Sequence, residues 1–254
     1  MPRTISVPFG IAAALVVLPL LPLSTSAAQF PPDSLVNLQY FPKDTPVRQL
    51  IGNMRQFSFA LGVRCQYCHV GEEGQPLSEF DFPSDEKRTK RTARIMLRMV
   101  EAINGSHLTN IPGRREPNVE VSCATCHRGL SRPRMLPQVL AETLSEEGLD
   151  ATVVQYRELR EEYYGSGSYD FSEMVLTEFA ETLVQQGSFD DALGILSLNG
   201  EMFPESVGVP FAAGNVLVAK GDTTAAIRMY ETAIEKAPHL RSRIQARIDQ
   251  LKSQ

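Results

Sequence analysis

The sequence predicts a mostly α-helical protein of two domains. Apolar residues recur at helical spacing over 45–62 and 84–105, and similar residues repeat 34 positions apart near the C-terminus. The charge divides as well: residues 29–137 carry 15 Lys and Arg against 11 Asp and Glu, whereas 138–254 carry 9 against 19. A chain of 254 residues can form two small domains, each with its own core. Because no dense basic stripe is present, we expect no nucleic-acid partner.

The N-terminus, "MPRTISVPFGIAAALVVLPLLPLSTSAAQF", predicts an export signal. A single Arg3 precedes an apolar run, and small residues follow up to Gln29. We therefore expect residues 1–28 to be a signal peptide and the mature protein to be periplasmic. The alternative is an uncleaved segment that anchors the chain to the membrane. Pro19 and Pro22 within the run favour cleavage.

The four cysteines form two copies of one pattern, "RCQYCHVG" and "SCATCHRG". Two CxxC pairs could form disulfides or bind zinc, but either use leaves the histidine behind each pair unexplained. Covalent attachment of haem uses every residue, because the cysteines form thioethers and the histidine binds iron. The pattern therefore predicts two haem c groups. Their covalent ligands would be Cys65, Cys68, Cys123 and Cys126, and their axial ligands His69 and His127.

A predicted helix lies just before the first CxxCH cassette. Thr45 is a suitable N-cap, Pro46 suits the first helical position and Gly62 ends the helix. Met54 lies on its apolar stripe, eleven residues before Cys65, and is a candidate sixth ligand of the first iron. The alternative is that Met54 only packs in the core. The other stripe residues are Val47, Leu50, Ile51, Phe57 and Leu61.

A second helix is predicted from Ser84, with acids in its first turn, to Asn104-Gly105. Met96 and Met99 share one face of it, so periodicity does not choose between them as the sixth ligand of the second iron. His107, just past the helix end, is a further alternative. The inward stripe comprises Ala93, Met96, Val100 and Ile103. The remaining histidine, His239, is predicted to lie on the surface.

The stretches "MRQFSFALGVRCQYCH" and "ARIMLRMVEAIN … VSCATCHRG" resemble the cytochrome c subunit of photosynthetic reaction centres, over about residues 36–137. In that family, each haem site is a helix bearing an axial methionine, a turn and then CxxCH. The resemblance implies Met54 and Met96 as axial ligands, and an electron relay to an oxidised partner such as a membrane-bound reaction centre. This chain differs from family members that carry four haems, lacks a lipid-anchor cysteine and has an additional domain.

The C-terminal part shows a helical repeat. After two helices joined at Glu147-Gly148, seven positions recur 34 residues later. This period is similar to that of tetratricopeptide repeats, which offer a concave surface to a partner protein. The alternatives are that these helices brace the first domain or form a homodimer. The paired positions are Leu183, Gly187, Ala192, Leu193, Leu196, Glu201 and Pro204 with Leu217, Gly221, Ala226, Ile227, Tyr230, Glu235 and Pro238.

Together these features predict a dihaem c-type cytochrome domain at 29–137 and a tetratricopeptide-like domain at 138–254. The expected function is one-electron transfer between redox proteins, not enzymatic catalysis. Ligation by His and Met raises the haem potential relative to two histidines, which suits a donor to a strong oxidant. Two alternatives stay open: a peroxidase- or reductase-like haem enzyme with one open iron site, and a redox-sensing assembly scaffold.

Overall fold

The computed structural model describes residues 29–115 and 117–253, and the predicted signal peptide lies outside that range. The described residues are mostly helical and contain no strand, which confirms the predicted fold class. Their one β-bridge joins Val70 and Asp81 and closes the loop that follows the first cassette. None of the helices in the described ranges is long and apolar enough to cross a bilayer.

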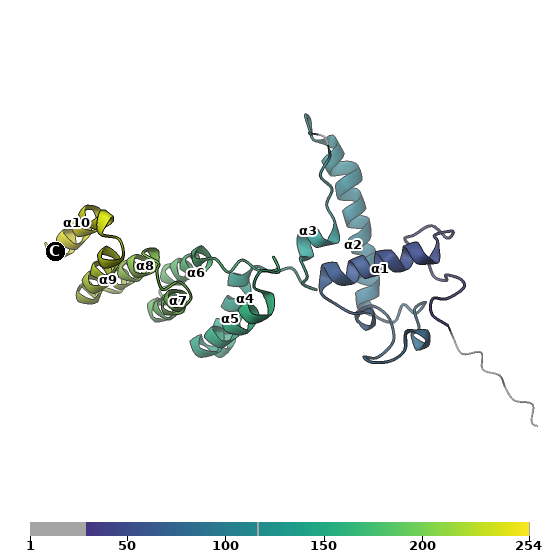
Figure 1. Cartoon of the computed structure of the whole chain (residues 1–254), viewed down its shortest axis with the longest axis horizontal. Helices are drawn as coiled ribbons and strands as arrows, with labels where there is room; N and C mark the ends of the chain where they lie inside the picture. The colour runs from purple at the N-terminus through teal and green to yellow at the C-terminus, as the bar shows by residue number, and fades with distance from the viewer. Residues whose placement is uncertain (1–28, 116, 254) are drawn as a thin grey trace, which may run out of the picture.

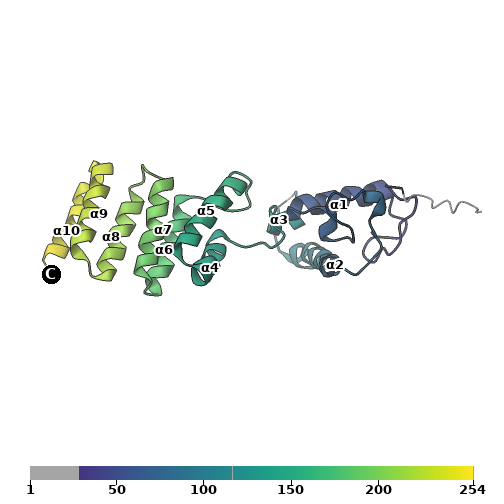
Figure 2. The ribbon, with the colours of Figure 1, turned by 90° about the horizontal axis from the view of Figure 1, so that it is seen from below.

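The N-terminal part consists of two longer helices and several short turns. Helix α1 runs along the long axis of the molecule, whereas α2 runs across it and is seen end-on in Figure 2 (Figures 1 and 2). The helices are α1 (Val47–Leu61), α2 (Arg88–Ala102) and α3 (Cys123–His127), and the turns are η1 (Cys65–Tyr67), η2 (Leu77–Glu79), η3 (Ile103–His107) and η4 (Leu108–Asn110).

The predicted end of the first helix is confirmed, but the predicted cap is wrong. Gly62 follows α1 with φ 64°, a left-handed conformation that glycine adopts without steric cost. Pro46, not Thr45, is the N-cap, and no side chain caps the helix. The Thr45 hydroxyl instead donates to the Pro42 carbonyl at 2.7 Å, so it stabilises the preceding turn. A hydroxyl can satisfy either site, and the sequence does not show which.

The predicted start of the second helix, at Ser84, is also wrong. Helix α2 begins at Arg88, and residues 84–87 form a loop. The Lys90 ammonium donates to three carbonyls in the preceding loop, so these do not take part in a helical ladder. At the other end the helical conformation does not stop at Asn104-Gly105 but continues through the π-turn η3. The inward stripe is confirmed: Ala93, Met96, Val100 and Ile103 are all half-buried.

The C-terminal part is a row of seven helices that stack in pairs along the chain (Figure 2). The join at Glu147-Gly148 is confirmed, because α4 ends at Glu147 and Gly148 has φ 88°. The helices are α4 (Leu136–Glu147), α5 (Leu149–Tyr163), α6 (Glu173–Gln185), α7 (Phe189–Met202), α8 (Gly208–Lys220), α9 (Thr223–Lys236) and α10 (Arg241–Lys252), with the turn η5 (Pro238–Leu240) before α10.

The 34-residue period has a structural counterpart. Gly187 and Gly221 both take positive φ, 80° and 90°, in the turns between paired helices. Ala192 and Ala226 are each 0% exposed where those helices pack, so small residues allow close approach. Helix α10 turns one apolar side inward and closes the array, as expected of a terminal helix. These features establish a helical repeat region; its assignment to the tetratricopeptide family stays a prediction.

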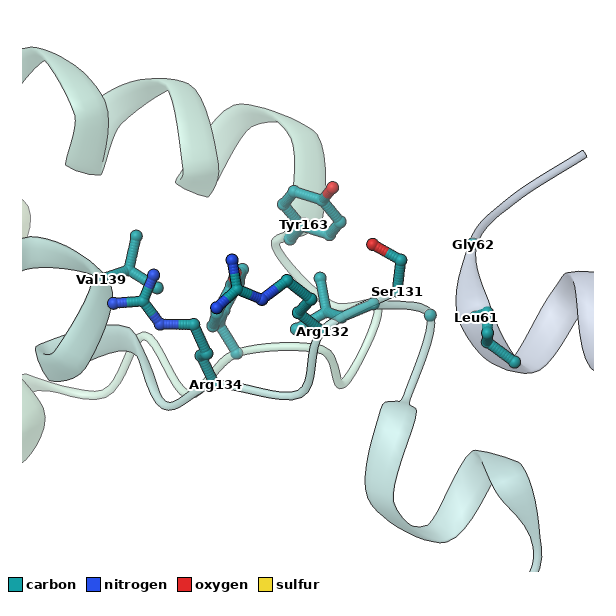
Figure 3. Close-up of a pocket in the computed structure, with 10 residues that line it drawn as sticks. Leu61, Gly62, Ser131, Arg132, Arg134, Val139 and Tyr163 are labelled. Carbon is teal, nitrogen blue, oxygen red and sulfur yellow. The ribbon is translucent and has the colours of Figure 1, made fainter. Parts of the chain in front are cut away.

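Hydrogen bonds fix the segment after the second cassette both to α1 and to the helical array. The Gly129 amide donates to the Ala60 carbonyl at 2.8 Å, which ties the end of α1 to the residue two beyond His127. The Ser168 hydroxyl, between α5 and α6, donates to the Arg128 carbonyl at 2.6 Å. A cavity of about 290 Å³ lies at this junction. Figure 3 shows Arg132 of the connecting segment beside Tyr163 of α5 at this cavity.

Candidate functional site

The first cassette is a single helical turn. The Cys68 and His69 amides both donate to the Cys65 carbonyl, at 3.2 and 3.0 Å. In such a turn, residues three and four apart lie on one side of the backbone. The two cysteines and the histidine are therefore presented together, which covalent attachment followed by iron ligation requires.

The tautomer of His69 is set by a carbonyl thirteen residues further on. Its Nδ1 lies 3.2 Å from the Phe82 carbonyl oxygen, and a carbonyl only accepts hydrogen bonds, so Nδ1 carries the proton. The Nε2 lone pair is then free to bind a metal. Burial lowers the pKa of His69 to about 4, and the charge of Lys90 adds to this effect. The imidazole is therefore neutral at ordinary pH, as a metal ligand must be.

The second cassette is the short helix α3. Its Ser122 amide, just before the helix, donates to the Thr125 hydroxyl at 3.0 Å. His127 Nδ1 lies 2.7 Å from the Leu130 carbonyl oxygen, so its tautomer is the same as that of His69. In return the Leu130 amide donates to the His127 carbonyl at 2.8 Å. Both histidines therefore direct an unprotonated Nε2 away from the backbone carbonyl that orients them.

The cysteines of both cassettes are half-buried or exposed and form no disulfide. Burial raises the pKa of Cys68 and of Cys123, so both are protonated thiols at neutral pH. Within the described ranges, no three His, Cys, Asp or Glu side chains gather as a metal-binding cluster. The two CxxC pairs are thus not brought together into the four-thiolate zinc site considered from the sequence.

The structure distinguishes the candidate sixth ligands by their exposure. Met54 on α1 and Met96 on α2 are half-buried, whereas Met99 is 42% exposed. His107 lies at the exposed end of η3, and His239 is exposed in η5. Periodicity alone placed Met96 and Met99 on one face, and of the two Met96 is the more buried.

The residues present fit a haem at each cassette. The donor set is a neutral imidazole with two cysteines in the spacing that thioether bonds require. The apolar surface fits as well: among the described residues before α4, the buried hydrophobic side chains are Ala60, Phe80 and Leu130. Helix α2 buries none of its residues, although one of its faces is apolar. A large flat apolar group would cover such half-buried stripes and complete a core.

Sequence reasoning did not find the residues that orient the ligands. The Phe82 and Leu130 carbonyls belong to the backbone, and nothing in their side chains marks that role. Lys90, which donates to the Phe82 carbonyl at 2.8 Å, was not singled out by the sequence patterns. The available signal was the position of Lys90 in the first turn of a helix that follows a proline-containing loop.

The two cassettes with their orienting carbonyls define a c-type cytochrome. The profile of the family described as photosynthetic reaction centre cytochrome C subunit matches residues 64–188. Cytochrome c-554 of Chloroflexus aurantiacus is 38% identical over 99 residues, which is 35% of this chain and 22% of that protein. Over residues 64–188 the chain is therefore similar to the reaction-centre cytochrome c subunit family, as its motifs indicated.

The matched segment differs in extent from the resemblance seen in the sequence. It includes both cassettes and Met96, but it begins at Arg64 and so leaves out Met54. At the other end it continues past residue 137, through α4, α5 and α6 to Ser188. Since the chain spans only about a fifth of the length of cytochrome c-554, the activity of that whole protein does not transfer to it directly.

Proposed function

We propose that this chain is an exported dihaem c-type cytochrome that transfers single electrons between redox proteins, with a photosynthetic reaction centre as one candidate partner. The observation that carries the proposal is that each CxxCH histidine donates Nδ1–H to a carbonyl, at 3.2 Å for His69 and 2.7 Å for His127. Both Nε2 atoms are then available to iron. When bound, a haem supplies reversible one-electron chemistry.

The half-burial of Met54 and Met96 supports these residues as the sixth ligands. A thioether on the open side of each iron would leave no site for substrate, which favours an electron carrier over an enzyme. Met99 and His107 remain the alternatives for the second iron. The exposure of both makes them poorer ligands, because a haem ligand must sit against the porphyrin.

The haem count tests this proposal most directly. The full-length chain, exported in a bacterium that matures c-type cytochromes, should carry two haems by pyridine haemochrome assay and by intact mass. A Cys65→Ser/Cys68→Ser double variant should carry one, and so should Cys123→Ser/Cys126→Ser. Pigment that acid acetone extracts, or a colourless protein, would contradict the proposal. Rapid stoichiometric binding of carbon monoxide to the reduced protein would favour a haem enzyme instead.

We also infer that the helical array docks a partner protein. A cavity of about 420 Å³ lies among α7, α8 and α9, and its lining is mainly apolar. The net charge of −10 over residues 138–254 favours a basic partner surface. The lining includes Leu193, Leu196, Phe203, Pro204, Val209, Pro210, Ala213, Leu217 and Met229.

Flash oxidation of purified reaction centres in the presence of the reduced protein tests this docking. The second-order rate of re-reduction should fall as ionic strength rises. Ala213→Glu places a charge in the cavity and should slow the reaction, whereas Gln186→Glu adds the same charge at an exposed position outside it. Equal rates for the two variants would exclude the cavity as the docking site, and no salt dependence would contradict the charge argument.

A further inference from the structure

Lys90 lies in the first turn of α2 and binds the loop that orients His69. Its ammonium donates to the carbonyls of Phe82, Pro83 and Ser84, at 2.8, 3.0 and 2.7 Å. The side chain is only 12% exposed, so these bonds are made largely out of water. Hydrogen bonds from a charged donor in such surroundings are stronger than neutral ones.

The Phe82 carbonyl therefore accepts from two donors at once. One is Lys90 Nζ and the other is Nδ1–H of His69, at 3.2 Å. A carbonyl that already receives a bond from a cation has less electron density to offer a second donor. The His69 N–H is consequently less polarised, and its imidazole gives less electron density to a metal at Nε2.

The second cassette lacks this arrangement. His127 Nδ1 lies closer to its carbonyl, 2.7 Å from Leu130, than His69 does to Phe82. In the described part of the chain, no Lys or Arg side chain donates to the Leu130 carbonyl. The two histidines thus hold the same tautomer but differ in the strength of the bond that orients them.

The charge of Lys90 is only partly offset by its neighbours. Asp85 Oδ1 lies 3.2 Å from Lys90 Nζ, but it also lies 2.8 Å from the Arg94 guanidinium. Two cations thus share the Asp85 carboxylate. Asp81 acts on Lys90 as well, but the charges that act on His69 itself are those of Lys90, Arg94 and Lys87, which are all positive. A positive charge favours the reduced, less positive form of an iron centre.

We propose that Lys90 is a positioning residue that raises the reduction potential of the haem held by His69 above that of the haem held by His127. The inference rests on the proposed dihaem function. Both effects of Lys90, the weakened histidine hydrogen bond and the retained positive charge, act in this direction. When one electron is supplied by an external reductant, it should reside mainly on the haem of the first cassette.

Spectroelectrochemical titration of the exported full-length protein tests the inference. Lys90→Met should lower the potential of the first haem and leave that of the second nearly unchanged. We expect the partition of one electron between the haems to change about tenfold, which corresponds to about 59 mV. The same substitution in the Cys123→Ser/Cys126→Ser background assigns the shifted step to the first haem.

Arg91→Met is the matched control. It removes one positive charge from the next residue of α2, but the Arg91 guanidinium donates to the Asp85 and Glu86 carbonyls and not to Phe82. Lys90→Gln keeps a donor without the charge and should cause a smaller shift than Lys90→Met. It also provides a second measurement should Lys90→Met fold poorly.

The outcomes separate the two proposals. A wild-type haem count below two overturns the proposed function. If the protein carries two haems but Lys90→Met and Arg91→Met shift the potential of the first haem equally, the role of Lys90 is overturned while the proposed function stands. The same holds if Lys90→Met shifts the potentials of both haems alike. A selective shift of the first step, larger for Lys90→Met than for either comparison variant, supports it.

Discussion

The side chain of Asn104 and the backbone of Val121 exchange two hydrogen bonds across 17 residues of sequence. Asn104 Nδ2 donates to the Val121 carbonyl and the Val121 amide donates to Asn104 Oδ1, both at 2.8 Å. The side-chain amide of Asn104 therefore pairs with the backbone of Val121 in the way that a neighbouring β-strand would. It fixes η3, which directly continues α2, to the residue two positions before Cys123, so the helix bearing Met96 and the second cassette are held together.

Replacing Asn104 should loosen this connection. Asn104→Ala leaves a part-buried donor and acceptor of Val121 without partners, and we expect a loss of about 1–3 kcal/mol in unfolding free energy. Thermal unfolding and hydrogen exchange at the Val121 amide measure the effect. In the control, Asn110→Ala, the lost bond is an exposed one to the Ser106 carbonyl, and the change should be below about 0.5 kcal/mol. Equal effects of the two variants would contradict the structural role of Asn104.

Gly62→Ala should be strongly destabilising. Gly62 has φ 64°, and a Cβ placed there would lie 2.0 Å from the Gly129 carbonyl oxygen, a backbone atom that cannot rotate away. We expect a loss of more than about 2 kcal/mol, measured by thermal unfolding. Gly52→Ala, within α1, is the matched control because its Cβ would meet no atom within 4 Å. It should be neutral or stabilising by about 0.5–1 kcal/mol.

The methionine assignments predict distinct spectra. Ferric protein should show the weak near-infrared band of methionine–iron ligation. Met96→Leu should remove the contribution of the second haem, whereas Met99→Leu should leave the band intact because Met99 is 42% exposed. Met54→Leu should remove the contribution of the first haem. If the full band survives in Met96→Leu, the ligand is another residue.

Acid stability should depend on Asp85. A hydrogen bond from Asn37, together with bonds from Lys90 and Arg94, holds the pKa of the Asp85 carboxyl well below its ordinary range, against the opposing effect of burial. As the pH falls, the Asp85 carboxyl is therefore protonated in the unfolded chain, at about pH 4, before it is protonated in the folded protein. The stabilisation that Asp85 provides above that pH is lost as the pH falls further.

Asp85→Asn should accordingly be less stable at pH 6 and should show a flatter pH dependence below pH 4. Thermal unfolding between pH 3 and 6 measures both. Asp44→Asn serves as the control, because Asp44 is exposed and forms no ion pair in the described ranges. A pH profile of Asp85→Asn parallel to that of the wild type would show that Asp85 does not contribute.

The helical array should be sensitive to volume at Gly214. A Cβ there would lie 2.5 Å from Cε1 of Tyr230, whose ring is 0% exposed and whose hydroxyl donates to Asn215 at 2.7 Å. Gly214→Ala should cost about 1–3 kcal/mol of unfolding free energy through overpacking. Gly200→Ala is the matched control, because a Cβ at residue 200 would lie 3.6 Å from its nearest atom, Cγ1 of Val209, which is an ordinary contact. Denaturant unfolding should show little or no loss for that variant.

The parts of the site that the sequence predicted are those with a strong local pattern. CxxCH places its three functional residues within one turn, so Cys65, Cys68 and His69 needed no tertiary information. The 34-residue period likewise located the helices of the array, because each pair buries residues such as Ala192 and Ala226 in equivalent places. Met96 and Met99 could not be separated, because one helical face is broad enough to include both.

What the sequence did not predict depends on backbone groups and long side chains. Ser84 has the character of an N-cap, but the helix starts later because Lys90 reaches back to the loop carbonyls. Thr45 is also a residue type that favours the N-cap, but its hydroxyl donates to the Pro42 carbonyl in the preceding turn instead. Such competition between local hydrogen-bonding partners is decided by tertiary geometry. The carbonyls of Phe82 and Leu130 are available in any residue, so their selection cannot be read from residue type.

The hydroxyl of Ser168, which is 2% exposed, bears on how small a functional version of this cytochrome can be made. It donates to the Arg128 carbonyl, directly after His127, and the nearby cavity is lined by Leu130 together with Tyr163 and Tyr169. A gene shortened to stop at residue 137 would strip this support from the second cassette. A self-sufficient pigment-carrying fragment must therefore extend at least past Ser168, and the family match likewise continues beyond residue 137, to residue 188.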